Sequence, residues 1–216
     1  MTVKSIPTTG RTLDMAASVY DLLEPLLLLG KEKEMNALLL SLLEIKPDHK
    51  ILDIGCGTGV FTSLISDKLD QDGYSIGIDA AGKMIEAARK KRGSSKCKFE
   101  AMAAEKLHFD DQLFNSAVST LFYHHVDRGL KQKSLNEAYR VLKPGGKLII
   151  ADMHIPTSFM GALVAHASRW ILVQPQIGEN IRGILPELIV DAGFSEPEKV
   201  QDYLGYISVF SSIKPE

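Results

Sequence analysis

The stretch Ile51-Leu-Asp53-Ile-Gly55-Cys-Gly57-Thr-Gly59 decides the fold of this chain. Its first four residues form a short, mostly apolar run that is typical of a buried strand, and glycines at every second position follow directly. Glycine lets the backbone turn tightly, and the missing side chain lets a ligand come close to the main chain. A helix is expected to begin at Val60, so the stretch predicts a ligand-binding turn between a strand and a helix.

Short apolar strands alternate with amphipathic helices beyond this turn. Strands are expected at residues 51–54, 74–78, 97–102, 117–121 and 147–151, and helices at residues 60–69, 83–91, 130–142 and 186–192. Strands that are separated by helices pair in parallel through right-handed crossovers. The pattern therefore predicts a doubly wound α/β fold.

The last two expected strands, 199–203 and 206–210, are separated only by Leu204 and Gly205. So short a connection can only form an antiparallel hairpin. We therefore expect a seven-stranded, mostly parallel, Rossmann-like sheet with a reversed last strand. Ahead of the sheet, residues 14–43 carry apolar side chains at helical spacing, whereas the segment 152–182 looks less regular.

Composition and charge describe an ordinary globular protein. The 216 residues are enough for one domain with a substantial core, and 45% of them are hydrophobic and 24% charged. The formal net charge of −2 provides no excess of positive charge for phosphates, which disfavours a nucleic acid as substrate. Cys56 and Cys97 are interpreted as reduced thiols of a cytoplasmic protein. Residues 1–11 do not resemble a secretory signal, and the apolar run Leu26–Leu29 is too short to cross a bilayer.

The spacing of the glycines distinguishes between two kinds of ligand that contain adenosine. The dinucleotide fingerprint requires its third glycine at position 60, where this chain has Val60, and this argues against a dehydrogenase. The glycines at 55, 57 and 59, with Asp53 ahead of them, resemble instead motif I of the class I S-adenosylmethionine-dependent methyltransferases.

This resemblance extends over roughly residues 50–151. The segments 104–109, 114–126 and 140–146 look like later motifs of the same family. The resemblance implies an enzyme, an S-adenosylmethionine-dependent methyltransferase, with S-adenosylmethionine as its cofactor, a small-molecule methyl acceptor and no metal ion.

The resemblance also indicates which residues hold the cofactor. Asp79 would accept the ribose hydroxyls, or would only cap the helix that follows it. Met84 would contact the adenine, or would simply fill the core. Ala103 stands where relatives often carry an aspartate, so backbone amides at 103 and 104 would replace that contact. The expected cofactor residues are Tyr20, Asp53, Gly55, Cys56, Gly57, Gly59, Asp79, Ala80, Met84, Ala103, Ala104, Glu105 and Thr120.

A pair of histidines, His124 and His125, follows the fourth expected strand. Methyl transfer from a sulfonium depends chiefly on alignment and on the exclusion of water. An acceptor that is a phenol or an acidic carbon must also lose a proton, and these histidines are the nearest candidates for the catalytic base. The alternative is that the pair only packs or caps the next helix. His154 has a similar but weaker position after the fifth strand.

The N-terminal part carries information about the acceptor. Tyr20-Asp21 with the leucine-rich stretch after it resembles the Tyr-Asp element of the ubiquinone and menaquinone biosynthesis methyltransferases. This implies a helical lid over residues 1–46, in which Tyr20 would contact the sulfonium or would be an ordinary buried tyrosine. A cofactor-binding core is expected at residues 47–152. A substrate segment, the last helix and the hairpin are expected at residues 153–216. Residues 1–216 are thus expected to form a single methyltransferase domain.

The expected substrate segment is apolar, and its large apolar residues are Phe159, Met160, Leu163, Val164, Trp170, Ile171 and Leu172. Such a segment favours a small lipophilic acceptor, quinone-like or phospholipid-like, and a transient contact with a membrane surface. Two alternatives stay open: a polar small metabolite as acceptor, and a non-catalytic module that only binds S-adenosylmethionine. Ala103, and Asn115 in place of the usual aspartate of the fourth strand, favour the second alternative. The sequence leaves the oligomeric state open.

Overall fold

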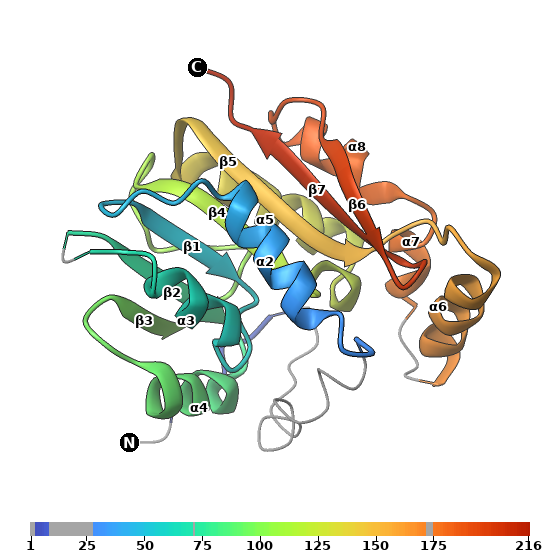
Figure 1. The fold of residues 1–216 in the computed structure, drawn as a ribbon, viewed down its shortest axis with the longest axis horizontal. Helices are drawn as coiled ribbons and strands as arrows, with labels where there is room; N and C mark the ends of the chain where they lie inside the picture. Colours follow the sequence, from blue (N-terminus) through green and yellow to red (C-terminus); the bar gives the residue numbers. More distant parts are fainter. Residues whose placement is uncertain (1–2, 9–27, 71, 172–174) are drawn as a thin grey trace.

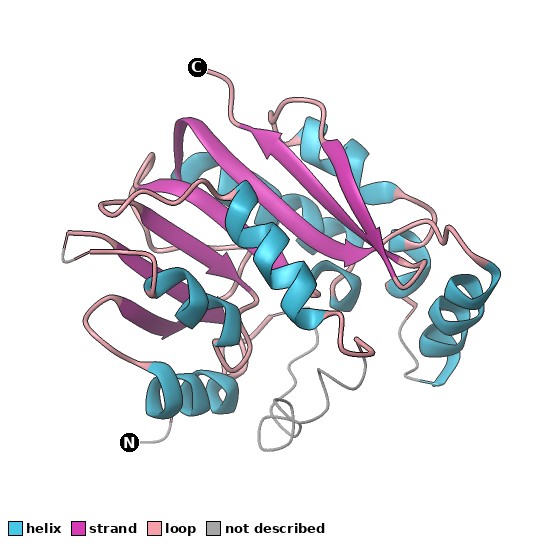
Figure 2. Cartoon of the chain, viewed as in Figure 1, coloured by secondary structure: helices cyan, strands magenta, loops and turns pink. Residues whose placement is uncertain are grey.

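The computed structural model describes residues 3–8, 28–70, 72–171 and 175–216, except for the side chains of residues 169–171. A twisted sheet with helices on both faces forms the centre of the chain (Figures 1 and 2). Its strands are β1 Lys50–Ile54, β2 Tyr74–Asp79, β3 Cys97–Ala101, β4 Phe114–Thr120, β5 Leu142–Met153, β6 Glu198–Tyr203 and β7 Ile207–Ile213. They lie in the order β3-β2-β1-β4-β5-β7-β6.

The sheet confirms the predicted doubly wound topology. The strands from β1 to β5 pair in parallel, whereas β7 pairs antiparallel with both β5 and β6. The last strand of the chain is therefore the reversed one, as predicted. It lies inside the sheet, between β5 and β6, so that β6 forms the edge and runs in the direction of β1 to β5.

Helices cover both faces of the sheet, and each face has its own hydrophobic core. The helices are α2 Glu32–Leu42, α3 Val60–Ser66, α4 Gly82–Arg92, α5 Arg128–Val141, α6 Phe159–Ile171, α7 Ile177–Asn180 and α8 Ile184–Asp191, with the 3₁₀ turn η1 at Tyr123–His125. Because successive strand residues point to opposite faces, Ile51 packs with α2 and α3 while Leu52 packs with α5 and α8. Both residues are fully buried.

The structure differs from the sequence prediction in the segment 152–182, which contains α6 and α7 instead of irregular chain. The prediction missed α6 although its apolar residues have helical spacing, because they lie on the exposed side and only small residues such as Gly161 and Ala165 face the core. Smaller differences lie at the ends of elements. Helix α3 ends at Ser66, and β5 begins at Leu142 and includes Pro144-Gly145-Gly146, which the sequence suggested as a stop.

Asn115 has a structural place at the start of β1. Its Oδ1 accepts hydrogen bonds from the backbone N–H of Lys50 at 3.0 Å and from Nζ of Lys143 at 3.3 Å. The side chain thus joins β1, β4 and the start of β5 at the amino end of the sheet. Across the part of the chain that the structure describes, no helix combines the length and the hydropathy that a membrane span requires.

Candidate cofactor and acceptor site

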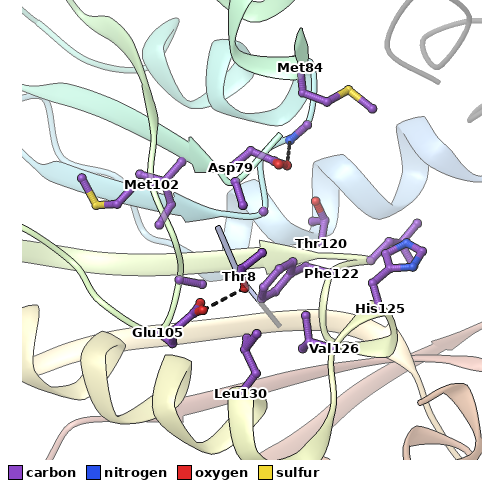
Figure 3. Close-up of a pocket in the computed structure, with 16 residues that line it drawn as sticks. Thr8, Asp79, Met84, Met102, Glu105, Thr120, Phe122, His125, Val126 and Leu130 are labelled. Carbon is purple, nitrogen blue, oxygen red and sulfur yellow. Dashed lines mark hydrogen bonds between the residues drawn. The ribbon is translucent and has the colours of Figure 1, made fainter. Parts of the chain in front are cut away.

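A cavity opens at the carboxyl ends of β1, β2 and β4, the edge where ligands bind in open α/β sheets (Figure 3). The turn after β1, the start of α4, the segment after β3 and the turn η1 all contribute to it. The lining residues are Thr8, Gly55, Gly57, Ile78, Asp79, Ala80, Met84, Met102, Ala104, Glu105, Thr120, Leu121, Phe122, His125, Val126 and Leu130.

The glycine turn has a backbone that other residues rarely adopt. The φ angles at positions 55, 57 and 59 are +75°, +54° and +82°. A Cβ atom on Gly55 would lie 2.6 Å from the ring of Phe122, and one on Gly59 would lie 2.3 Å from the ring of Phe99. Glycine is therefore required here by both conformation and packing, and the predicted strand, turn and helix are confirmed.

Asp53 lies behind the turn and is not among the residues that line the cavity. It is buried, and its Oδ2 accepts a 2.6 Å hydrogen bond from Oγ1 of Thr62 in α3. Its Oδ1 has no hydrogen-bond partner among the described residues. Burial raises the pKa of this carboxyl to about 7, and the negative charge of Asp79 acts in the same direction. Asp53 thus holds the first turn of α3 and keeps one oxygen without a donor.

A second, smaller hollow lies between the glycine turn and α2. Glu32, Met35 and Asn36 of α2 line it together with Cys56 and residues of the turn. Burial, with the negative charges of Asp53 and Asp79, raises the pKa of the Cys56 thiol well above its usual value, so the thiol stays protonated. Helix α2 therefore borders the turn from within the segment 1–46 that the sequence predicts as a lid.

Asp79 holds the start of α4 and lines the cavity, and the ribose role that the sequence left open stays a prediction. Its Oδ1 accepts the backbone N–H of Ala81 at 2.8 Å, which caps α4, and its Oδ2 accepts the backbone N–H of Gly57 at 3.1 Å. The carboxylate also lines the cavity, as Figure 3 shows. It connects the glycine turn to α4 and presents negative charge to a ligand.

Glu105 is the second carboxylate of the cavity. Its Oε1 accepts a 2.8 Å hydrogen bond from Oγ1 of Thr8, which reaches the cavity from the N-terminal segment (Figure 3). The backbone N–H of Ile6 donates to the carbonyl of Ala80 at 2.8 Å and so ties that segment to the start of α4. The buried Oε2 of Glu105 has no partner among the described residues. A buried carboxylate oxygen without a donor suits a ligand that carries hydroxyl groups.

The two predicted catalytic histidines lie together in η1. His125 lines the cavity, and its ring centroid is 3.9 Å from that of His124. Nδ1 of His124 lies 2.8 Å from Oδ1 of Asp152 at the end of β5. Because a carboxylate can only accept, Nδ1 of His124 donates to Asp152.

Asp152 is held in place by several further donors. Its Oδ2 accepts the backbone N–H of Tyr123 at 2.6 Å, and its Oδ1 accepts the backbone N–H of Met153 at 2.7 Å and Nδ2 of Asn180 at 3.3 Å. Burial alone would raise the pKa of this carboxyl, but His124 and the hydrogen bonds outweigh it and the pKa is lowered. Asp152 is therefore a buried, ionised and fixed partner for His124.

Sequence comparison agrees with this geometry. Residues 51–146 match the family model of a methyltransferase domain. The chain is 31% identical to the ubiquinone/menaquinone biosynthesis C-methyltransferase of Wigglesworthia glossinidia brevipalpis over 141 residues, which are 63% of this chain and 56% of that protein. It is 27% identical to the protein of the same name from Pseudomonas syringae pv. tomato, over 98% of this chain and 93% of that protein. The chain belongs to the class I S-adenosylmethionine-dependent methyltransferases.

Solved structures show the fold of this methyltransferase. Phosphoethanolamine N-methyltransferase 2 of Haemonchus contortus, bound to phosphomonomethylethanolamine and S-adenosylhomocysteine, has a TM-score of 0.70 and 16% identity, over 94% of this chain and 58% of that chain. At this identity the likeness concerns the fold alone. Family membership confirms S-adenosylmethionine as the cofactor. The alignment spans little more than half of the Wigglesworthia relative, so it does not establish the acceptor.

The predicted cofactor residues of this methyltransferase divide into four groups. Those that line the cavity are Gly55, Gly57, Asp79, Ala80, Met84, Ala104, Glu105 and Thr120, and Cys56 lines the hollow beside α2. Asp53, Gly59 and Ala103 do not line the cavity, and Tyr20 lies outside the described residues. His154 is buried against Phe210, with ring centroids 4.9 Å apart, and does not line the cavity either.

Sequence reasoning missed part of the site. The lining residues that it did not name are Thr8, Ile78, Met102, Leu121, Phe122, Val126 and Leu130, and it also missed Asp152. Phe122 and Val126 flank the histidine pair, and Asp152 directly follows the expected fifth strand. Phe122, Val126 and Asp152 could therefore have been predicted from their positions at the carboxyl edge of the sheet. Thr8 had no such signal, because a distant segment brings it to the cavity.

Proposed function

We propose that this methyltransferase transfers the methyl group of S-adenosylmethionine to a lipophilic acceptor of the quinone type. The observation that carries the proposal is the apolar side of the cavity, where Phe122, Val126 and Leu130 lie away from Asp79 (Figure 3). An aromatic acceptor would bury its ring against these side chains with few polar contacts. The likeness to proteins named as C-methyltransferases of ubiquinone and menaquinone biosynthesis supports this class of acceptor.

The polar side of the cavity suits the cofactor. Asp79 and Glu105 would accept the hydroxyl groups of the ribose, and Oε2 of Glu105 already lacks a donor. Met84 and Met102 would provide apolar contact for the adenine. When bound, S-adenosylmethionine supplies a methyl group on a positively charged sulfonium, which is a good leaving group. The glycine turn would let the backbone approach it closely.

We propose that His125, the histidine that lines the cavity, is the base that removes a proton from the acceptor. A quinol is a weak acid, and removing its O–H proton makes the ring carbon a better nucleophile towards the methyl group. The methylated ring would then regain aromaticity by losing the hydrogen of that carbon as a proton and taking a proton back at oxygen. His124 lies against His125, and the carboxylate of Asp152 holds it and would stabilise positive charge that forms on the pair. The apolar side chains around them would exclude water from the acceptor.

An acceptor panel tests this proposal. The purified chain is given S-adenosylmethionine and either a short-chain naphthoquinol without its ring methyl group, a catechol, or phosphoethanolamine, and release of S-adenosylhomocysteine is measured. We expect turnover with the naphthoquinol, kept reduced by dithionite, and none with phosphoethanolamine. Turnover confined to the polar amine would reject a lipophilic acceptor. Cofactor binding without turnover on any acceptor would favour the non-catalytic module.

A further inference from the structure

Helix α6 presents its large apolar side chains to the outside of the protein. We define the α6 face as the exposed side chains Phe159 (83%), Met160 (63%), Leu163 (55%) and Val164 (39%). Their spacing of i, i+1, i+4 and i+5 places them along one side of the helix. In the surface helices of globular proteins this apolar side normally packs against the core. Ile155, just ahead of the helix, is also half exposed and extends the apolar surface.

The opposite side of α6 makes the contact with the protein, and it is built from small residues. A Cβ atom on Gly161 would lie only 2.1 Å from the carbonyl oxygen of Gly205, so the helix packs closely on the turn between β6 and β7. Ala165 is fully buried in a cluster with Met153 and Ile177. The anchoring of α6 therefore does not require the α6 face, whose exposure calls for another explanation.

Helix α6 lies at the same edge of the sheet as the opening of the cavity. The helix follows β5 at the carboxyl edge of the sheet, the edge at which the cavity opens (Figure 1). It packs on α7, and α7 packs on η1, which provides His125 to the cavity. A surface that binds α6 would therefore lie on the same edge of the protein as the cavity.

The charge of the segment indicates what kind of surface this is. Residues 153–178 contain no Asp or Glu, although 27 of the 216 residues of the chain are acidic. Arg169 is the one Lys or Arg of this stretch, and Glu179 directly after it is paired with Lys131 of α5. Interfacial helices insert an exposed apolar face and are attracted to anionic lipids by Lys and Arg, and this segment has no acidic side chain that anionic lipids would repel.

We propose that the α6 face docks on the surface of an anionic lipid bilayer and thereby brings the cavity to an acceptor dissolved in the membrane. The second part of this inference rests on the proposed lipophilic acceptor, whereas the docking itself does not. A helix of this kind would lie parallel to the bilayer, with its apolar side chains inserted at the level of the headgroups.

Vesicle binding tests the docking. The full chain is sedimented with vesicles of phosphatidylcholine and phosphatidylglycerol, and the double variant Phe159→Ser/Leu163→Ser is compared with it. We expect the double variant to bind at least about tenfold more weakly, because two inserted apolar side chains are lost. The matched control, Val190→Ser/Ile213→Ser, removes two exposed apolar side chains from α8 and β7 and should bind like the original chain. Calorimetric binding of S-adenosylhomocysteine verifies that both variants are folded.

Two results would overturn the docking. One is equal vesicle binding by the original chain and the folded α6 variant. The other is a chain that does not bind vesicles but forms a dimer, seen by analytical ultracentrifugation, that the α6 variant abolishes; the α6 face would then contact a second copy. Because vesicle binding needs no turnover, a chain that docks but methylates no quinol would support the docking and reject the proposed acceptor.

Discussion

Asp152 holds His124 through a 2.8 Å contact between Oδ1 and Nδ1, and it does so from the end of a different strand. The two residues are 28 positions apart, yet His124 follows β4 and Asp152 lies near the end of β5, and these two strands end at the same edge of the sheet. Because Tyr123, Met153 and Asn180 also donate to Asp152, the carboxylate cannot turn away from the histidine. The histidine pair is therefore fixed in orientation before any ligand binds.

Replacing His125 with glutamine tests the base in the proposed mechanism. Glutamine keeps a similar size and polarity but cannot take up a proton at neutral pH. We expect kcat to fall by about 10²- to 10⁴-fold, the usual contribution of a general base. Binding of S-adenosylhomocysteine, measured by calorimetry, should stay unchanged, since the change affects the acceptor side of the cavity. A variant with nearly full activity would leave the pair with a packing role only.

Asp152→Asn tests whether this carboxylate positions His124 and stabilises its charge. The neutral side chain removes negative charge beside the pair, so the acidic limb of the pH profile of kcat should move to lower pH. The new amide group also faces a backbone N–H, which should cost about 1–3 kcal/mol of folding stability. A purely structural role would lower stability and leave the shape of the pH profile as it was.

Gly59→Ala tests the need for glycine in the turn after β1. The added Cβ would lie 2.3 Å from Phe99, and the residue has a φ of +82°. We expect a loss of stability of roughly 2–5 kcal/mol in urea unfolding, since strain and overpacking add. Gly145→Ala is the matched control, because its φ of +73° is similar but no atom of the described residues lies within 4 Å of the new Cβ. It should lose only about 1–2 kcal/mol. Equal losses would mean that packing against Phe99 is unimportant.

The sequence predicted the features that depend on local pattern. The strand ending at Ile54, the glycines after it and Asp79 at the end of β2 all appear where the pattern places them. What it missed depends on contacts between distant segments. Thr8 meets Glu105 across 97 positions of sequence, and α6 packs through Gly161 while its larger side chains face outward. The first contact leaves no periodic signal in one short stretch, and the periodicity of α6 does not show that its apolar side faces outward.

Glu105→Gln should weaken cofactor binding. The amide can still accept the hydrogen bond from Thr8, but the position of the unpartnered Oε2 becomes a donor that cannot accept a ribose hydroxyl. Calorimetry should show about a tenfold to hundredfold loss of affinity for S-adenosylmethionine, the range for a hydrogen bond to a charged group. Thr8→Val removes the hydrogen bond to Oε1 of Glu105 but keeps the carboxylate, so it should change the affinity far less. A larger loss of affinity in Thr8→Val than in Glu105→Gln would mean that the N-terminal segment, and not a contact with the ribose, determines the affinity.

The raised pKa of Asp53 predicts that the stability of the fold depends on pH. Its pKa is about 7 in the folded protein, against about 3.9 in an unfolded chain. Between these values the folded state keeps a proton that the unfolded state has lost, so the stabilising effect is complete below about pH 4 and is lost as the pH rises through 7. The effect is at most a few kcal/mol, since one pKa unit corresponds to about 1.4 kcal/mol. Asp53→Asn cannot titrate and can still accept from Thr62, so its melting temperature should rise relative to that of the original chain as the pH rises from about 4 to 7. The exposed control Asp110→Asn should show no such trend, and a constant difference for Asp53→Asn would contradict the raised pKa.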